Sequence, residues 1–276
     1  MNEIEVIRSI PKDLNIKHAC FDHDGTLSTL REGWIDIMAN MMAECILGGK
    51  NHEDSRCPTI YKCCLDYINR TKGTQTLVQM GGLIEIIKDF KYIDEKDILS
   101  IYEYKDICND RVRKVVESRI SKLNRGELEC FDLQIKNACR FLQALGGYEV
   151  RLYLFSGNDD KDVQKEVSEL RYKHLFHGGV WGSGNINTEI KHKILCQLVG
   201  EQKIPAHEIV VFGDGPIEIR AAKRLGILAV GVASNETRRY GLNEEKRKTL
   251  INVGADIIIP DYSQMNSLLK VLGVKE

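Results

Sequence analysis

Beyond Gly147 the chain alternates between short apolar runs and longer segments whose apolar residues recur at helical spacing. Short apolar runs stopped by polar clusters are typical of buried β-strands. The alternation predicts a parallel sheet covered by helices on both faces, with a ligand site at the carboxyl ends of its strands. The predicted strands are 150–155, 179–181, 209–212, 228–232 and 256–259, and the predicted helices lie near 160–173, 189–200, 216–225 and 263–272.

Another apolar run, at 16–21, reads as a strand of the same sheet, but the segment that follows it has a different texture. From about 34 to 145 the apolar residues fall at helical spacing, and a crossover between parallel strands does not take a segment of this length. We therefore predict an α/β fold. Its core is a Rossmann-like, doubly wound parallel sheet formed by 1–30 and 146–276, and an all-helical domain is inserted at 31–145.

Composition narrows the class of partner. The 39 Lys and Arg residues nearly balance the 40 Asp and Glu residues, so no overall field attracts nucleic acid or an anionic membrane, and we expect a small-molecule partner.

The first residues lack the pattern of a signal peptide, and no apolar run reaches the roughly 18 residues of a membrane span, which favours a cytoplasmic location. The nine cysteines contain no CxxC pair and are expected to be reduced core residues. The oligomeric state is left open.

Polar signatures follow three of the predicted strands. The first strand ends in Asp22-His-Asp24-Gly-Thr26, the second in Ser156-Gly157-Asn158, and a later one in a Gly-Asp-Gly turn around Asp214 that leads to Glu218. Each signature alone is more often a plain turn. In a parallel sheet, however, the three strand ends share one edge, so their side chains are predicted to converge.

These signatures, in this order, resemble the four motifs of the haloacid dehalogenase-like superfamily, in particular its phosphatase branch. The first motif is DxDGT(L) at 22–27, the second is Ser156, the third is a Lys before the last acidic motif, and the fourth is GDG-x-x-[DE] at 213–218. The inserted helices are similar to the type 1 cap of the phosphoglycolate phosphatase and β-phosphoglucomutase-like members. The match covers the whole alternating core.

The resemblance implies a role for each carboxylate. Asp22 would be the nucleophile that forms an aspartyl-phosphate, and Asp24 would be the general acid and base. Mg²⁺ would be held by Asp22, Asp214 and the backbone carbonyl of Asp24, with Glu218 acting through a bound water. The family more often has Asp at the position of Glu218.

Phosphate oxygens need positively charged or polar donors. The resemblance assigns this role to Thr26, Ser156, the loop amide at Gly157 and one lysine. Two lysines, Lys191 and Lys193, lie at the start of one predicted helix, and the spacing to Asp214 favours Lys191. His23 should point away along the strand. Candidate substrate contacts in or near the cap are Arg31, Lys72, Gln75 and Gln79.

Asp24 points to an oxygen leaving group, since members of the family that cleave carbon–halogen bonds lack an acid at this position. We therefore expect a Mg²⁺-dependent phosphatase acting on a small phosphorylated metabolite, either a sugar phosphate or a phosphoglycolate-like acid. One alternative is a phosphomutase of the β-phosphoglucomutase type, which shares all four motifs. Another is a non-catalytic binding protein on the same scaffold.

Overall fold

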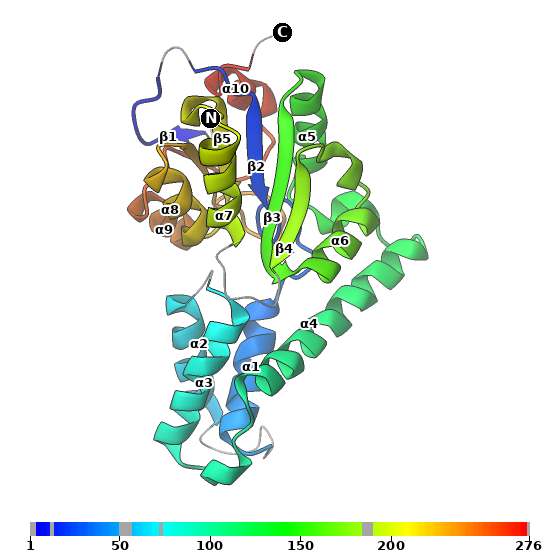
Figure 1. The fold of residues 1–276 in the computed structure, drawn as a ribbon. Helices are drawn as coiled ribbons and strands as arrows, with labels where there is room; N and C mark the ends of the chain where they lie inside the picture. Colours follow the sequence, from blue (N-terminus) through cyan, green and yellow to red (C-terminus); the bar gives the residue numbers. More distant parts are fainter. Residues whose placement is uncertain (1–3, 12–13, 50–56, 72–73, 184–189, 275–276) are drawn as a thin grey trace. The chain divides into compact units, whose positions relative to one another are not determined.

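The computed structural model describes residues 4–11, 14–49, 57–71, 74–183 and 190–274. The chain forms two compact units. One comprises Met1–Glu32 and Lys122–Glu276 and contains the sheet, and the other is Gly33–Ser121 and is helical (Figure 1). Within the described residues, no helix is both long enough and apolar enough to span a bilayer.

The sheet unit is built on seven strands in the order β1-β7-β6-β5-β2-β3-β4. All neighbouring pairs are parallel except β1 with β7. The predicted parallel α/β sheet is therefore confirmed, while β1 adds an edge strand too short to give a periodic signal in the sequence. The strands are β1 Glu5–Val6, β2 His18–Asp22, β3 Arg151–Asp159, β4 Gly179–Ser183, β5 Ile209–Gly213, β6 Leu228–Val232 and β7 Ile257–Ile259.

Helices cover both faces of this sheet (Figure 1). Successive strand residues point to opposite faces, so each strand can pack against helices on both sides. On one face Cys20 and Val211 pack with residues of three helices in a continuous buried cluster. On the other face Phe21 stacks on Phe212, with ring centroids 4.5 Å apart, and both contact Phe141. The helices are α5 Ala138–Gly147, α6 Asp160–Glu169, α7 Ile190–Cys196, α8 Pro216–Arg224, α9 Glu244–Asn252 and α10 Met265–Val271.

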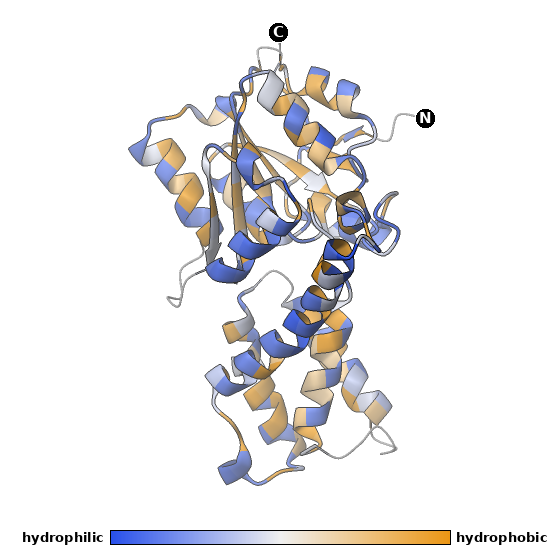
Figure 2. Cartoon of the chain, turned by 90° about the vertical axis from the view of Figure 1, so that its right-hand side faces the viewer, coloured by the Kyte–Doolittle hydropathy of each residue, from blue (hydrophilic) through white to orange (hydrophobic). Residues whose placement is uncertain are grey.

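The helical unit has a core of its own, formed where the apolar stripes of its helices meet. Met42, Cys64 and Leu83, from three different helices, are fully buried in it. Figure 2 shows these helices carrying hydrophobic and hydrophilic residues on different sides, as expected for amphipathic helices around a core. The helices are α1 Trp34–Ile46, α2 Cys57–Arg70, α3 Thr76–Phe90 and α4 Ile101–Asn124.

Short helical turns link these elements. They are the 3₁₀ turns η1 Glu95–Asp97, η2 Cys130–Leu133, η3 Lys173–Leu175 and η5 Ala206–Glu208, and the π-helical turn η4 Gln197–Glu201 after α7.

The division of the chain differs from the predicted domain boundary at 145. The helical unit ends at Ser121, and the segment from Lys122 onward belongs with the sheet. The physical reason is that α5 packs against β3 and buries Phe141 and Leu145 in the core of the sheet unit. Helical spacing alone does not reveal which core an amphipathic helix joins.

Candidate active site

Three parallel neighbours, β2, β3 and β5, end at one edge of the sheet. Phe21 pairs with Phe212 of β5, and Asp22 pairs with Phe155 of β3. Ser156 therefore follows in β3 next to Asp22, and Asp214 comes directly after β5. The register brings the three polar signatures to the same edge.

Lys191 bridges two buried carboxylates at this edge. Its Nζ lies 2.8 Å from Oδ1 of Asp22 and 2.8 Å from Oε2 of Glu218. Burial opposes the charge of Lys191, but the two carboxylates outweigh burial and raise its pKa. Lys193, the other predicted candidate, is exposed on the same helix. The geometry therefore favours Lys191 as the lysine of the site.

Asp22, Asp214 and Glu218 form a compact carboxylate cluster whose ligand atoms lie within 4.8 Å of one another. Burial raises the pKa of Asp22 well above its ordinary value, and Glu218 and Asp214 raise it further, while Lys191 opposes these shifts. A cluster of this kind repels its own charges unless a cation offsets them.

The donor set suits a hard divalent cation, which prefers carboxylate oxygens. The backbone of Gly25 also comes close to this carboxylate cluster: Gly25 has a φ of +72°, and a Cβ there would clash with Oδ2 of Asp214. Only glycine fits this position without moving the aspartate. The residues present therefore fit Mg²⁺ held by Asp22 and Asp214.

Glu218 makes two contacts of its own. Its Oε1 accepts a hydrogen bond of 2.7 Å from the amide of Gly215, which precedes the first turn of α8, and its Oε2 faces Lys191. Pro216 occupies the first turn of that helix, as the sequence suggested. Glu218 is thus both a cap of α8 and the partner of Lys191.

A second buried lysine was missed by the sequence reasoning. Nζ of Lys246, in α9, lies 2.6 Å from Oδ2 of Asp214 and 2.6 Å from Oε1 of Glu236. Burial disfavours its charge, but Asp214 and Glu236 outweigh burial and raise the pKa of Lys246. No sequence signal marks Lys246 or Glu236, because neither belongs to a motif and only the tertiary fold brings them to Asp214.

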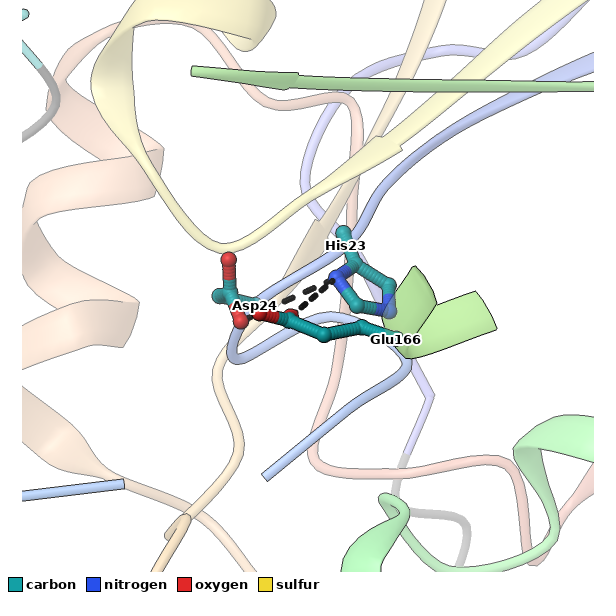
Figure 3. A group of neighbouring side chains, drawn as sticks. All are labelled: His23, Asp24 and Glu166. Carbon is teal, nitrogen blue, oxygen red and sulfur yellow. Dashed lines mark ion pairs between the residues drawn. The ribbon is translucent and has the colours of Figure 1, made fainter. Parts of the chain in front are cut away.

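The two carboxylate oxygens of Asp24 have different surroundings; we call Oδ2 the outward oxygen and Oδ1, which is buried, the inward oxygen. Nδ2 of Asn158 donates a hydrogen bond to Oδ2 of Asp24. Oδ1 is buried and has no hydrogen-bond partner among the described residues. It faces Nδ1 of His23 at 3.7 Å and Nε of Arg31 at 4.0 Å. Figure 3 shows His23 directed at Asp24 and at Glu166, so His23 does not point away from the site as expected.

The predicted phosphate-binding residues lie in the turn after β2, which contains Thr26, and within β3, which contains Ser156 and Gly157. Thr26 is buried, and its Oγ1 has no hydrogen-bond partner in the part of the chain that the structure describes. Oγ of Ser156 is also buried and accepts a hydrogen bond of 3.2 Å from the amide of Asn158. Gly157 is exposed, and a Cβ there would meet nothing within 4 Å.

The predicted substrate contacts are occupied within their own units. Arg31 belongs to the sheet unit and pairs with Glu166 through Nε and Nη2. Gln79 is buried in the helical unit, where its Nε2 donates to Oγ1 of Thr71 at 3.2 Å. Its side chain thus serves internal packing instead of an exposed surface. Lys72 lies outside the described residues.

Solved structures with the same fold carry related names. A protein named as a predicted phosphoglycolate phosphatase from Haemophilus somnus has a TM-score of 0.61 and 16% identity, covering 92% of this chain and 97% of its own. A β-phosphoglucomutase from Clostridium difficile has a TM-score of 0.60 and 14% identity, covering 93% and 97%. A haloacid dehalogenase-like family hydrolase from Streptococcus pneumoniae has a TM-score of 0.56 and 15% identity, covering 92% and 97%.

These identities are low, so the likeness bears on the fold alone. A search among curated proteins gave no match. The model of the haloacid dehalogenase-like hydrolase family, by contrast, matches residues 16–226. That range contains every predicted motif residue, from Asp22 to Glu218. The chain therefore belongs to the haloacid dehalogenase-like hydrolase family, as the four motifs indicated.

Proposed function

We propose that this protein is a Mg²⁺-dependent phosphatase that hydrolyses the phosphate monoester of a small metabolite. The observation that carries the proposal is the buried Asp22 carboxylate, 2.8 Å from the ammonium of Lys191 and clustered with Asp214 and Glu218. A phosphoryl group needs a nucleophile, a fixed positive charge and a cation site, and this edge of the sheet offers all three.

In the proposed reaction a carboxylate oxygen of Asp22 attacks phosphorus, and the bond from phosphorus to the alcohol oxygen breaks. Asp24 gives its proton to the departing alcohol. Asp24 then accepts a proton from water as that water attacks the phosphorus of the aspartyl-phosphate, which releases inorganic phosphate and regenerates Asp22. Covalent catalysis of this kind divides one difficult displacement into two easier ones.

The cation would be held by the side chains of Asp22 and Asp214 and by the backbone carbonyl of Asp24, with Glu218 holding a water of its shell. Mg²⁺, when bound, offsets the charge that these carboxylates and the phosphate bring together. Lys191 keeps Asp22 and Glu218 paired at the same edge.

The remaining phosphate oxygens would accept hydrogen bonds from Thr26, Ser156 and the amide of Gly157. The buried hydroxyl of Thr26, which has no hydrogen-bond partner within the described ranges, supports its part in this set. Buried hydroxyls are usually paired, so such a group is a candidate ligand contact. The leaving group is proposed to be a sugar or a short acid; the cytoplasmic location stays a prediction.

The direct test is incubation with Mg²⁺ and p-nitrophenyl phosphate, followed by a panel of phosphorylated sugars and acids. Release of phosphate is expected, and Asp22→Asn should abolish it while the thermal unfolding profile shows an intact fold. Mg²⁺ should raise the melting temperature of the wild type more than that of Asp214→Asn. No release from any ester would favour the non-catalytic alternative.

The phosphomutase alternative uses the same site, and one of the solved structures with this fold is named as such an enzyme. The two activities differ in the acceptor of the phosphoryl group, which is water in one case and a sugar in the other. Conversion of a hexose 1-phosphate into its 6-phosphate isomer with little free phosphate would favour the mutase.

A further inference from the structure

Beside Asp24 the sheet unit buries a two-pronged ion pair. Nε of Arg31 lies 3.0 Å from Oε1 of Glu166, and Nη2 lies 2.6 Å from the same oxygen. The Glu166 side chain is only 2% exposed and that of Arg31 only 12%. Burial raises the pKa of Glu166, and the contact with Arg31 opposes that shift.

His23 connects this ion pair to Asp24. Its Nδ1 lies 3.7 Å from Oε2 of Glu166 and 3.7 Å from Oδ1 of Asp24 (Figure 3). Its Nε2 lies 2.7 Å from the hydroxyl of Tyr172, which is buried as well. Burial lowers the pKa of His23, which favours the ring with a single proton. If the hydroxyl donates to Nε2, the single ring proton sits on Nδ1 and faces the two carboxylates.

The two oxygens of Asp24 thus have different contacts, a hydrogen bond on the outward one and electrostatic contacts at 3.7 and 4.0 Å on the inward one. Asn158 donates to its outward oxygen, and His23 and Arg31 face its inward oxygen with a partial and a full positive charge. Contacts on both oxygens limit rotation of the Asp24 carboxylate, so the same oxygen faces the site in each turnover. Proton transfer requires such a fixed orientation.

We propose that Arg31 and Glu166 are positioning residues, which act through His23 to fix the Asp24 carboxylate for proton transfer to the leaving group. This inference rests on the proposed function of Asp24 as general acid. It also gives Arg31 a different task from the substrate contact that the sequence suggested.

Stability alone gives a weak reason for such an arrangement. Removing two charges from water costs several kcal/mol per ion, and an apolar pair of similar volume often stabilises a fold as well or better. The strands and helices nearby already bury a large apolar core. Placing the pair beside Asp24 is more readily explained by control of that carboxylate than by packing.

The test compares two esters of similar shape. Phenolate is a poor leaving group without a proton, whereas p-nitrophenolate leaves readily without one. The quantity measured is the ratio of kcat/KM for p-nitrophenyl phosphate to kcat/KM for phenyl phosphate, which covers the steps up to release of the alcohol. Asp24→Asn should raise this ratio, because it removes the proposed proton donor and so slows release of phenolate more than release of p-nitrophenolate. Arg31→Lys and Glu166→Gln should each raise the ratio in the same direction, by about tenfold.

Two controls separate positioning from stability. Arg247→Lys makes the same change in another two-pronged pair, with Glu5, in which Nε and Nη2 of Arg247 contact the carboxylate at 2.8 and 2.6 Å. This variant should leave the ratio unchanged. The double variant Arg31→Met with Glu166→Leu removes both charges together, and should keep the melting temperature near that of the wild type while the ratio stays raised.

The outcomes are distinct. A wild type that hydrolyses both esters, with an unchanged ratio in Arg31→Lys and Glu166→Gln, would overturn the positioning inference and leave the proposed phosphatase standing. Recovery of the wild-type ratio in the double variant would show that the pair only stabilises the fold. A wild type inactive on every ester would overturn the proposed function, and the positioning inference with it.

Discussion

Lys191 sets the charge balance of the proposed site at the level of single residues. It contacts Asp22 and Glu218 at 2.8 Å each, and all three side chains are nearly inaccessible to solvent. Without this ammonium, two buried carboxylates would face each other and Asp214. Breaking a buried pair by removing one partner is costly because the remaining charge has no counter-ion.

We therefore expect Lys191→Met to lower kcat/KM by about a hundredfold or more, since a fixed charge that stabilises the reacting group is lost. It should also lower the free energy of unfolding by about 3 kcal/mol in the absence of metal. Lys193→Met is the matched control, because Lys193 is exposed on the same helix and should change neither value appreciably. Equal effects of the two substitutions in steady-state kinetics and urea unfolding would contradict the assignment.

The sequence predicted the residues that follow strands, and missed those that support them. Asp22, Ser156 and Asp214 are predictable because parallel strands end at one edge, so three local patterns become one site. Lys246 and Glu236 are not, since contacts formed only in the folded chain bring them to Asp214. The same is true of Glu166, which lies 135 residues from Arg31.

At the level of elements, β2 runs from one edge of the sheet, where its strands begin, to the edge that carries the proposed site. Its last residue, Asp22, enters the proposed site, and its first residue, His18, lies at the opposite edge. Nδ1 of His18 lies 2.9 Å from the hydroxyl of Tyr153 in β3, the parallel neighbour of β2. Burial lowers the pKa of His18, and Arg151 and Lys17 lower it further, although Glu208 opposes them.

This shift makes the stability of the strand pair depend on pH. In the unfolded chain His18 gains a proton near its ordinary pKa of 6.5, whereas in the folded chain it gains one only at lower pH. Unfolding therefore takes up a proton in the window below pH 6.5. The contribution of His18 to stability is complete above that pH and is lost as the pH falls through the lowered folded-state pKa.

We expect wild type to lose more unfolding free energy than His18→Gln between about pH 7.5 and pH 5.5, measured by urea denaturation. The control is His174→Gln, which replaces an exposed histidine and should lose as much as the wild type. The same pH dependence in wild type and His18→Gln would refute the expected contribution of His18.

Most of these elements were predictable, but β1, the helix α9 and the unit to which α5 belongs were not. Strands buried on both faces give short apolar runs, which is why β2, β5, β6 and β7 lie within two residues of their predicted bounds. By contrast, β3 runs four residues past its predicted end at Phe155. The helix α5 was placed in the inserted domain because its spacing is helical like that of its neighbours. It belongs to the sheet unit because its Phe141 contacts Phe21 and Phe212 of the sheet.

For the whole molecule, the chain contains two separate hydrophobic cores, one formed on the sheet and one formed between helices. One is the sheet core, in which Phe141 is fully buried, and the other is the helical core, in which Leu83 is fully buried. The sequence predicted an insertion after the first strand, since no crossover needs so long a segment. It could not predict how far the insertion extends, because both cores use amphipathic helices.

Two separate cores predict two separate units of cooperative opening. Leu83→Ala removes buried side-chain volume from the helical core and Phe141→Ala from the sheet core, and each should cost about 3 to 5 kcal/mol. In hydrogen exchange measured by mass spectrometry, Leu83→Ala should speed exchange in α1, α2 and α3 and leave β2 and β5 protected. Phe141→Ala should produce the reverse pattern, so each variant is the control for the other. A loss of protection in both units in either variant would mean that the two cores unfold as one.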